Sequence, residues 1–220
     1  MKRIINDHIN LIGKKTIDHG CAGVVYDLGN GTCYKKIFNE EYTNIKDKGN
    51  ILRTIMNLRL SNFCRIEEIV YDREGYVIGY LMPIYKQDKL DVLSLPKDYI
   101  LNSYRNIYNG VLILSQNGIF MNDFDSHNTF ITNEGVIVYD FDMYLMVDRI
   151  DYLIIRNVAQ LNILFNQIFK EEALFKHSIY NPRLIDANID SLFGARTNPE
   201  LLDDTLSKYQ SPIEYLKVRH

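Results

Sequence analysis

The sequence predicts an α+β protein whose two halves differ in secondary structure. Residues 16–37 and 66–85 hold runs rich in β-branched and aromatic residues that are broken by glycine turns, which is typical of antiparallel hairpins. Residues 96–118 and 154–168 instead repeat apolar residues at helical spacing. In residues 122–142, two acidic clusters flank a short apolar hairpin. We therefore expect a small antiparallel sheet with one helix, followed by a mainly helical region with short hairpins.

The composition admits one substantial core or two small lobes that share a cleft. The chain has 220 residues, of which 46% are hydrophobic, and a net charge of −3. Acidic residues gather in its second half, so no strongly basic face of the kind that binds nucleic acid is expected. We therefore expect no nucleic-acid partner.

Three cysteines, Cys21, Cys33 and Cys64, match neither the paired spacing of zinc ligands nor an even disulfide framework, so we expect reduced thiols. In residues 1–10, polar side chains interrupt the apolar core that a signal peptide would need. No apolar run approaches the ~18 residues that would span a membrane. The expected location is the cytoplasm.

Residues 16–37 predict three strands that are joined by two turns. The first turn contains Gly20 and Gly23, where missing side chains would let backbone N–H groups approach phosphate oxygens. An ordinary hairpin turn is the alternative. In the third strand, alternation puts Lys35 on one face with apolar neighbours. If that face is buried, Lys35 needs an anionic partner; a half-exposed lysine with its stem on the sheet is the alternative.

A helix over residues 40–60 and a hairpin over residues 66–85 follow. Pro83 ends the second strand of the hairpin because proline cannot donate to the ladder, and the polar residues after it suit a connector. We place a boundary there, with residues 1–85 and 86–220 as the two lobes of one domain.

The second lobe is expected to contain two strong helices, over residues 96–118 and 154–168, whose apolar faces belong to the core. Asn198-Pro199 and Ser211-Pro212 each predict a further helix start, since an N-cap residue precedes a proline at the first helical position. Glu214 would complete a capping box at the second of these starts.

The stretch 122–142 predicts a site for a metal and phosphate. Residues 129–132 and 136–139 are two short strand-like runs around a tight turn, so Asp140 should fold back beside Asn128. Carboxylates greatly outnumber cations here, and a cation is needed to offset their repulsion. Hard oxygen ligands of this kind suit Mg²⁺.

The order of these parts resembles the protein-kinase-like superfamily over nearly the whole chain. The glycine turn followed by Val25, the strand lysine, a helix, a hairpin, a connector and a helix come in that order. They lead to Asp123-x-x-x-x-Asn128, a hairpin and Asp140-Phe141-Asp142, which are similar to the catalytic loop and the Asp-Phe-Gly motif of that superfamily. The resemblance implies a bilobal kinase-like fold, with a small antiparallel sheet and one helix in the N-terminal lobe and a mainly helical C-terminal lobe. It also implies ATP and Mg²⁺ as cofactors.

The resemblance implies a role for each polar residue of the site. Asp123 would orient the acceptor hydroxyl and take its proton, and Lys35 would contact the α- and β-phosphates. Asn128 and Asp140 would bind Mg²⁺, with Asp140 bridging it to the phosphates. A loop-capping aspartate is the alternative for Asp123.

The resemblance also implies residues that hold the adenine. Val25 and Cys33 would lie above it and Phe130 below it. The connecting segment with Met82 and Ile84 would offer backbone hydrogen bonds to its edge.

Several residues depart from the pattern of the family. Asp18 stands at the first glycine position, and Met121-Asn122 replaces His-Arg before the catalytic aspartate, so regulation through a phosphorylated activation loop is not expected. Asp125 stands where protein kinases place a lysine, and Asp142 replaces the glycine of Asp-Phe-Gly. Asp125 could be a third metal ligand. His127 could help offset the acidic charge if protonated; a solvated loop histidine is the alternative.

The helix after Lys35 should carry a glutamate that pairs with it, but alignment puts Ile51 at that position. Asp47, Glu40 and Glu41 are the candidates to replace it. Only a short segment separates the Asp-Phe-Asp motif from the next helix, and no Ala-Pro-Glu motif follows. These departures favour a compact, atypical kinase.

The sequence therefore leads to an ATP- and Mg²⁺-dependent phosphotransferase of a bacterial or phage Ser/Thr protein-kinase type, which transfers the γ-phosphate to a hydroxyl of an unidentified acceptor. A small-molecule kinase of the aminoglycoside-phosphotransferase type is the first alternative. A pseudokinase that binds nucleotide or acts as an interaction module is the second, and transfer of the nucleotide itself is the third. The joint presence of Lys35, Asp123, Asn128 and Asp140 favours an active enzyme.

Overall fold

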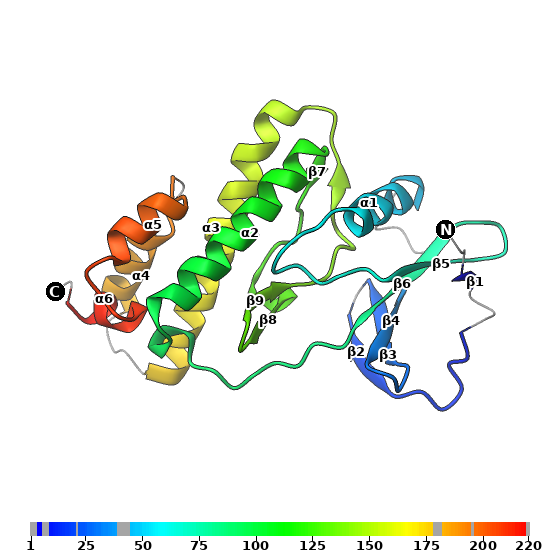
Figure 1. The fold of residues 1–220 in the computed structure, drawn as a ribbon, viewed down its shortest axis with the longest axis horizontal. Helices are drawn as coiled ribbons and strands as arrows, with labels where there is room; N and C mark the ends of the chain where they lie inside the picture. Colours follow the sequence, from blue (N-terminus) through cyan, green and yellow to red (C-terminus); the bar gives the residue numbers. More distant parts are fainter. Residues whose placement is uncertain are drawn as a thin grey trace.

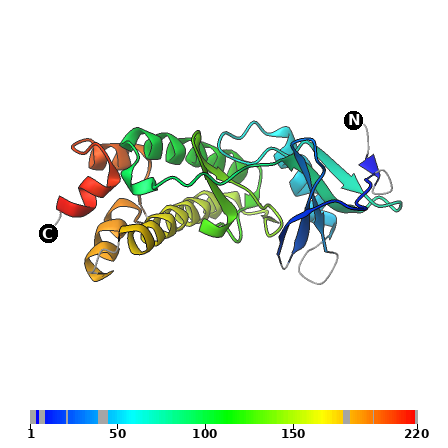
Figure 2. The same cartoon turned by 90° about the horizontal axis from the view of Figure 1, so that it is seen from below.

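The computed structural model describes residues 4–5, 9–20, 22–38, 45–177, 182–194 and 196–218. These residues form a β-sheet with one helix, followed by a group of helices with short hairpins, so the expected α+β class is confirmed. Figure 1 shows the sheet and α1 at one end of an elongated molecule, and Figure 2 shows the same separation after a quarter turn. We call residues 9–83 the sheet region and residues 97–218 the helical region.

Six strands form the main sheet in the order β1-β5-β6-β4-β3-β2. Their bounds are β1 (Ile4–Ile5), β2 (Thr16–His19), β3 (Gly23–Asp27), β4 (Thr32–Ile37), β5 (Glu68–Tyr71) and β6 (Val77–Pro83). Neighbouring strands are antiparallel except β1 and β5, which are parallel. The predicted three strands within residues 16–37 and the later hairpin are confirmed, and β6 ends at Pro83. The β1 pairing was not predicted, because two residues carry no periodicity.

Both faces of the central strands are buried. On one face, α1 (Ile45–Asn57) packs Ile51, Leu52 and Ile55 against the sheet within the main core. On the other face, Tyr34 joins Val70 and Ile78 in a second cluster. The predicted helix over residues 40–60 is confirmed from Ile45 to Asn57, and residues 58–60 lie beyond its end.

The helical region is built on α2 (Lys97–Gln116) and α3 (Ile150–His177), which pack along each other. The shorter helices α4 (Pro182–Leu192), α5 (Pro199–Leu206) and α6 (Pro212–Val218) lie at the end remote from the sheet. Asn198 caps α5 as predicted, since its Oδ1 accepts from the Leu201 N–H at 2.9 Å. Helix α6 begins at Pro212 as predicted, but Glu214 accepts from the Gln210 N–H at 2.9 Å, one residue before the N–H that the predicted capping box would use.

Two small antiparallel ladders lie between the sheet and the long helices. β8 (Thr129–Thr132) pairs with β9 (Gly135–Val138), and β7 (Ile119–Phe120) pairs with β10 (Leu145–Met146). The short 3₁₀ helices are η2 (Val92–Ser94) and η3 (Ser126–Asn128). The predicted acidic hairpin is therefore confirmed, although its second strand begins one residue earlier.

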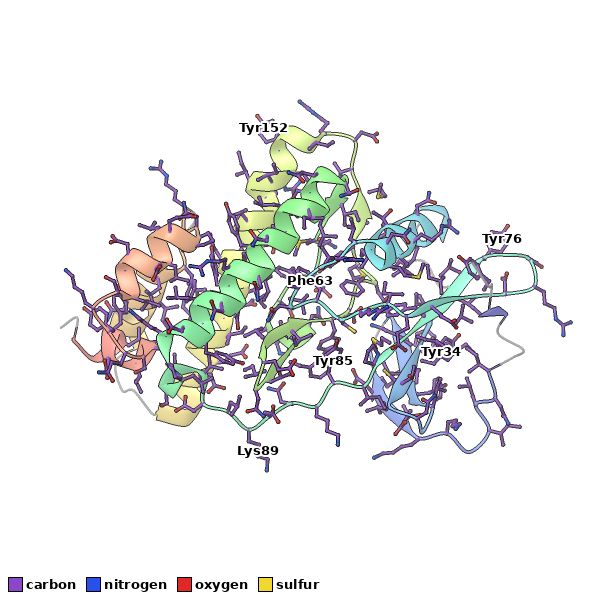
Figure 3. The ribbon with its side chains drawn as sticks, in the orientation of Figure 1. Tyr34, Phe63, Tyr76, Tyr85, Lys89 and Tyr152 are labelled. Carbon is purple, nitrogen blue, oxygen red and sulfur yellow. The ribbon has the colours of Figure 1, made fainter. Side chains whose placement is uncertain are left out.

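The connection between α1 and β5 joins the sheet region to the helical region. Asn62 accepts from the Val138 N–H at 2.8 Å through its carbonyl, and its Nδ2 donates to the Val136 carbonyl at 2.9 Å. Asn106 of α2 donates to Asn62 Oδ1 at 2.9 Å. The ring of Phe63 lies against Gly110 of α2, and Figure 3 shows it between the two regions. This connection fixes how the β4 strand faces the acidic hairpin.

Candidate functional site

Lys35 of β4 lies between two carboxylates that follow the β8–β9 hairpin. Its Nζ is 2.5 Å from Oδ2 of Asp140 and 2.8 Å from Oδ2 of Asp142. The side chain of Lys35 is 7% exposed and that of Asp142 is 0% exposed, whereas Asp140 keeps 24%. The prediction that a buried Lys35 needs an anionic partner is confirmed, and both aspartates of the Asp-Phe-Asp motif supply it.

Burial and charge act in opposite directions on the groups of this cluster. Burial lowers the pKa of Lys35, but the carboxylates of Asp142 and Asp140 outweigh burial and hold it above its ordinary value. Burial raises the pKa of the Asp142 carboxyl to about 6, although Lys35 opposes the rise. The ion pairs therefore favour the charged form of Lys35.

The hairpin brings the predicted pair Asp123 and Asn128 to the same place. The Tyr139 N–H donates to the Asn128 carbonyl at 2.9 Å, so Asp140 does fold back beside Asn128. Nδ2 of Asn128 donates to the carbonyl of Asp123 at 2.7 Å and lies 3.4 Å from its Oδ2. Because the amide nitrogen is used in this way, its oxygen is the atom left for a cation.

Two of the four predicted polar residues have unusual backbone conformations. Asp123 and Asp140 adopt φ values of 61° and 66°, in the left-handed region that most L-residues avoid. Short polar side chains tolerate this region better than others do, and such strain concentrates at functional sites. The backbone conformation of both aspartates therefore supports the same candidate site as the ion pairs of Lys35 do.

A second buried lysine, Lys48, reaches the cluster from α1. The residue is 5% exposed, and its Nζ donates to the carbonyl oxygen of Asp142. Burial lowers the pKa of Lys48, against the opposing effect of Asp142 and Asp140. Sequence reasoning missed Lys48, although its spacing from the buried Ile51, Leu52 and Ile55 was a signal that it lies on the inward face of α1.

No acid of α1 contacts Lys35 in the part of the chain that the structure describes. Ile51, which aligns with the expected glutamate, is 2% exposed and belongs to the apolar core. Glu40, Glu41 and the side chain of Asp47 lie outside the described residues.

Asp125 has a structural role in the loop before the hairpin. Its Oδ1 accepts from the His127 N–H at 2.9 Å and caps η3. The exposed ring of His127 lies beside it, with Nδ1 3.7 Å from the same oxygen. Ser126 fixes this loop to α3 through Oγ, which donates to Glu171 at 2.7 Å. The carboxylate of Asp125 is thus occupied by its own loop.

Of the predicted adenine contacts, Cys33 and Met82 are buried beside each other on paired strands. Sγ of Cys33 lies 3.5 Å from the Met82 carbonyl and 3.8 Å from that of Pro83. The Ile84 N–H already donates to the Gly31 carbonyl at 2.9 Å. The carbonyls of Met82 and Pro83 are therefore the backbone groups of this segment that face the cysteine.

The aromatic floor predicted below the adenine lies on the hairpin. Phe130 of β8 stacks on Tyr139 at 4.2 Å between ring centroids and on Tyr85 at 6.1 Å. Figure 3 shows Tyr85 on the segment that joins the two regions. Val25 is half-buried and packs on the main core.

The two glycines of the first turn have different surroundings. Gly20 donates to the Gly23 carbonyl at 3.0 Å, and a Cβ at Gly20 would meet nothing within 4 Å. A Cβ at Gly23 would lie 2.4 Å from the carbonyl oxygen of Lys36 on β4. Gly23 is therefore required by strand packing, whereas Gly20 leaves open space at the turn.

The donor set fits a phosphate-bound hard cation. Among the residues that the structure describes, no three Asp, Glu, His or Cys side chains cluster as a ready metal site. Asp140 and Asn128 instead supply two oxygen ligands, which matches how Mg²⁺ binds when phosphates and water complete its shell. The ammonium of Lys35 lies 2.5 Å from Oδ2 of Asp140.

A cavity of about 600 Å³ lies elsewhere, at the end of α1 and the connection that follows it. Its lining comes from residues 55–66 and includes Arg59 and Arg65. None of the predicted site residues lines it. The lysine–aspartate cluster, where ionisable groups from distant segments converge, is therefore the better candidate site.

Neither protein-family models nor curated proteins gave a match to the chain. None of the helices in the described ranges has the length and apolar character that crossing a membrane requires.

Proposed function

We propose that the chain is a compact phosphotransferase of the protein-kinase-like type, which uses ATP and Mg²⁺ and transfers the γ-phosphate to a hydroxyl. One observation carries the proposal: Lys35 of β4 lies 2.5 Å from Asp140, and the same hairpin holds Asn128 against Asp123. These are the four polar residues that phosphoryl transfer asks of a protein.

In this proposal each residue has a separate task. Asp140 and Asn128 hold Mg²⁺, which when bound offsets phosphate charge and orients the phosphates. Lys35, beside Asp140, neutralises phosphate oxygens. Asp123, exposed at the mouth of the site, orients the acceptor hydroxyl and takes its proton. Positioning and charge neutralisation, rather than covalent chemistry, supply the catalysis.

A protein serine or threonine is the first candidate acceptor. A small-molecule hydroxyl is the second, and one observation favours it: β10 pairs with β7 directly after the Asp-Phe-Asp motif, and α3 begins at Ile150. The segment 143–149 is too short to offer an extended docking surface for a peptide. Labelling with γ-labelled ATP distinguishes the two acceptors by whether protein or small molecules gain the label.

The proposal is tested by ATP turnover in the parent, Asp123→Asn and Asp140→Ala. Asp123→Asn should keep nucleotide binding and lose about 10²–10⁴-fold in turnover, because it removes the base. Asp140→Ala should lose Mg²⁺-dependent nucleotide binding, because it removes a metal carboxylate. Asp204→Asn, an exposed change on α5, is the matched control and should behave as the parent.

Each other outcome has a defined meaning. Nucleotide binding without turnover in the parent would indicate that the protein is a pseudokinase. Transfer of label from the α- but not the γ-position would indicate nucleotide transfer. Equal turnover in all four proteins would show that the assigned residues do not carry the reaction.

A further inference from the structure

The charges around Lys35 are arranged in reverse of what the resemblance implies. Ile51 stands at the helix position where the resemblance implies a glutamate, and a buried lysine, Lys48, lies about one turn before it on α1. The position after Phe141, where the resemblance implies glycine, carries the buried carboxylate of Asp142 instead. Among the described residues, the second carboxylate that contacts Lys35 therefore follows the β8–β9 hairpin, and α1 contributes a lysine to the cluster.

The two carboxylates that contact Lys35 are not equivalent. Asp140 is the more exposed one and lies beside Asn128, with its Oδ2 on Lys35 and its Oδ1 accepting from the Asp142 N–H at 3.2 Å. Asp142 is fully buried, and its Oδ2 is 2.8 Å from Lys35. Its Oδ1 has no hydrogen-bond partner among the described residues. Once Asp140 holds a metal ion, Asp142 is the carboxylate that still holds Lys35.

Lys48 makes the burial of this extra acid possible. Lys35, Asp140 and Asp142 alone carry one net negative charge away from solvent, and Lys48 brings the sum to zero. In the described part of the chain, the ammonium of Lys48 bonds to the Asp142 carbonyl and lies within ion-pair distance of no carboxylate. The charge of Lys48 is therefore balanced by the net charge of the cluster. Its hydrogen bond connects α1 to Asp142, the residue that contacts Lys35.

We propose that Asp142 is a positioning residue that holds Lys35 in place of a helix acid, and that Lys48 locks α1 onto it. The contact itself is independent of the proposed function, whereas its effect on catalysis rests on that function. Loss of either charge leaves the other buried charges unbalanced, so the two residues act as one unit. The packing of α1 against Asp142 and the positioning of Lys35 by Asp142 should therefore be gained or lost together.

The contact is tested by amide hydrogen exchange of α1 in the parent, Lys48→Met, Asp142→Asn and the double variant. Met keeps the apolar stem of Lys48, and Asn keeps the shape and the backbone carbonyl of Asp142. Each single change should speed exchange of α1 amides roughly tenfold, because Lys48→Met removes the bond to the Asp142 carbonyl and Asp142→Asn leaves the two buried lysines with one carboxylate fewer to balance them. The double variant should exchange no faster than the quicker single one, because it removes one charge of each sign and restores the balance of the cluster.

Matched controls separate this contact from a general loss of packing. Lys36→Met changes the neighbouring lysine on the other face of β4 and should leave α1 exchange as in the parent. Lys48→Arg keeps the charge and should recover most of the protection. Additive effects of Lys48→Met and Asp142→Asn, or unchanged exchange in Asp142→Asn, would overturn the proposal, provided that circular dichroism shows folded protein.

The catalytic consequence needs a second measurement. Asp142→Asn should lower kcat roughly tenfold or more and change ATP affinity much less, because a misaligned Lys35 fails mainly in the transition state. An affinity loss as large as the kcat loss would contradict a positioning role. If the parent turns over no ATP, the proposed function fails, while the exchange data still decide whether Lys48 and Asp142 are coupled.

Discussion

Two buried thiols lie next to the candidate nucleotide site. Sγ of Cys64 is 3.5 Å from Sδ of Met82, and Cys33 lies on the other side of the same methionine. Burial raises the pKa of Cys33 to about 11 and raises that of Cys64 as well. Since the thiolate is the reactive form, both residues should be inert in the folded protein.

Alkylation with iodoacetamide measures this directly. At pH 8 the thiolate fraction of Cys33 should be about 10⁻³, so its labelling should be far slower than that of a free thiol. The rate should keep rising with pH until the pH approaches the raised pKa. Peptide mapping after labelling with and without denaturant gives the two rates, and equal rates for Cys33 in both would contradict its burial.

At the scale of elements, α3 holds the strand that leads into the candidate catalytic loop. Oδ1 of the buried Asn157 accepts from the Met121 N–H at 3.0 Å. Its Nδ2 donates to Oγ of Ser115 and to the carbonyl of Ile119, both at 2.9 Å. One side chain thus joins α3, the end of α2 and β7, two residues before Asp123.

Asn157→Leu should lower the free energy of unfolding by at least about 3 kcal/mol. Leu has a similar volume, but it leaves buried donors and acceptors of Met121, Ser115 and Ile119 without this partner, at a cost of about 1–3 kcal/mol for each unmet group. Asn166→Leu, which removes a surface hydrogen bond to Asp190 from the same helix, is the control. Chemical denaturation measures both; similar losses in the two variants would refute the argument.

Elements with a sequence period could be predicted, and pairings between distant elements could not. The strands within residues 16–37 and helices α2 and α3 follow from alternation and helical spacing. Helix α4 was missed. The pairing of β7 with β10 was missed too, because strands of two residues show no period and their partner is set by tertiary packing.

The candidate site was predictable to the same extent. Lys35 and Asp140 could be matched because each stands in a recognisable local motif, and the structure brings them into contact. The roles of Asp142 and Lys48 could not be predicted, because the partner of a buried charge can be any residue that the fold brings near it, however distant in the sequence. The family pattern also led us to expect the partner of Lys35 on α1, whereas Asp140 and Asp142 follow the β8–β9 hairpin.

At the scale of the whole molecule, the sheet and helical regions meet at the lysine–aspartate cluster and at a tightly packed connection around Phe63. A Cβ at Gly110 of α2 would lie 2.3 Å from Cε2 of Phe63. Phe63 is 5% exposed and stacks on Phe124, with 6.5 Å between ring centroids, so it has little room to move. Glycine is therefore required in the middle of α2 by the ring that crosses it.

Gly110→Ala should destabilise the protein by about 1–3 kcal/mol through overpacking, although alanine favours a helix by about 1 kcal/mol. Phe63→Leu in the same chain should recover part of that loss by removing the ring. Asn109→Ala, an exposed change in the same turn, should be neutral or slightly stabilising. Thermal unfolding of the parent and the three variants is the measurement, and a Gly110→Ala variant as stable as the parent would show that the connection is loosely packed.

The reversed charges at Asp142 and Lys48 also restrict how such a site could arise. A chain that gained the buried acid first would hold an unbalanced anion, and one that gained the helix lysine first would hold an unbalanced cation. Either intermediate would be less stable than both end points, so the two positions should be inherited together. An alignment of descendants of such an ancestor should therefore show either both residues or neither.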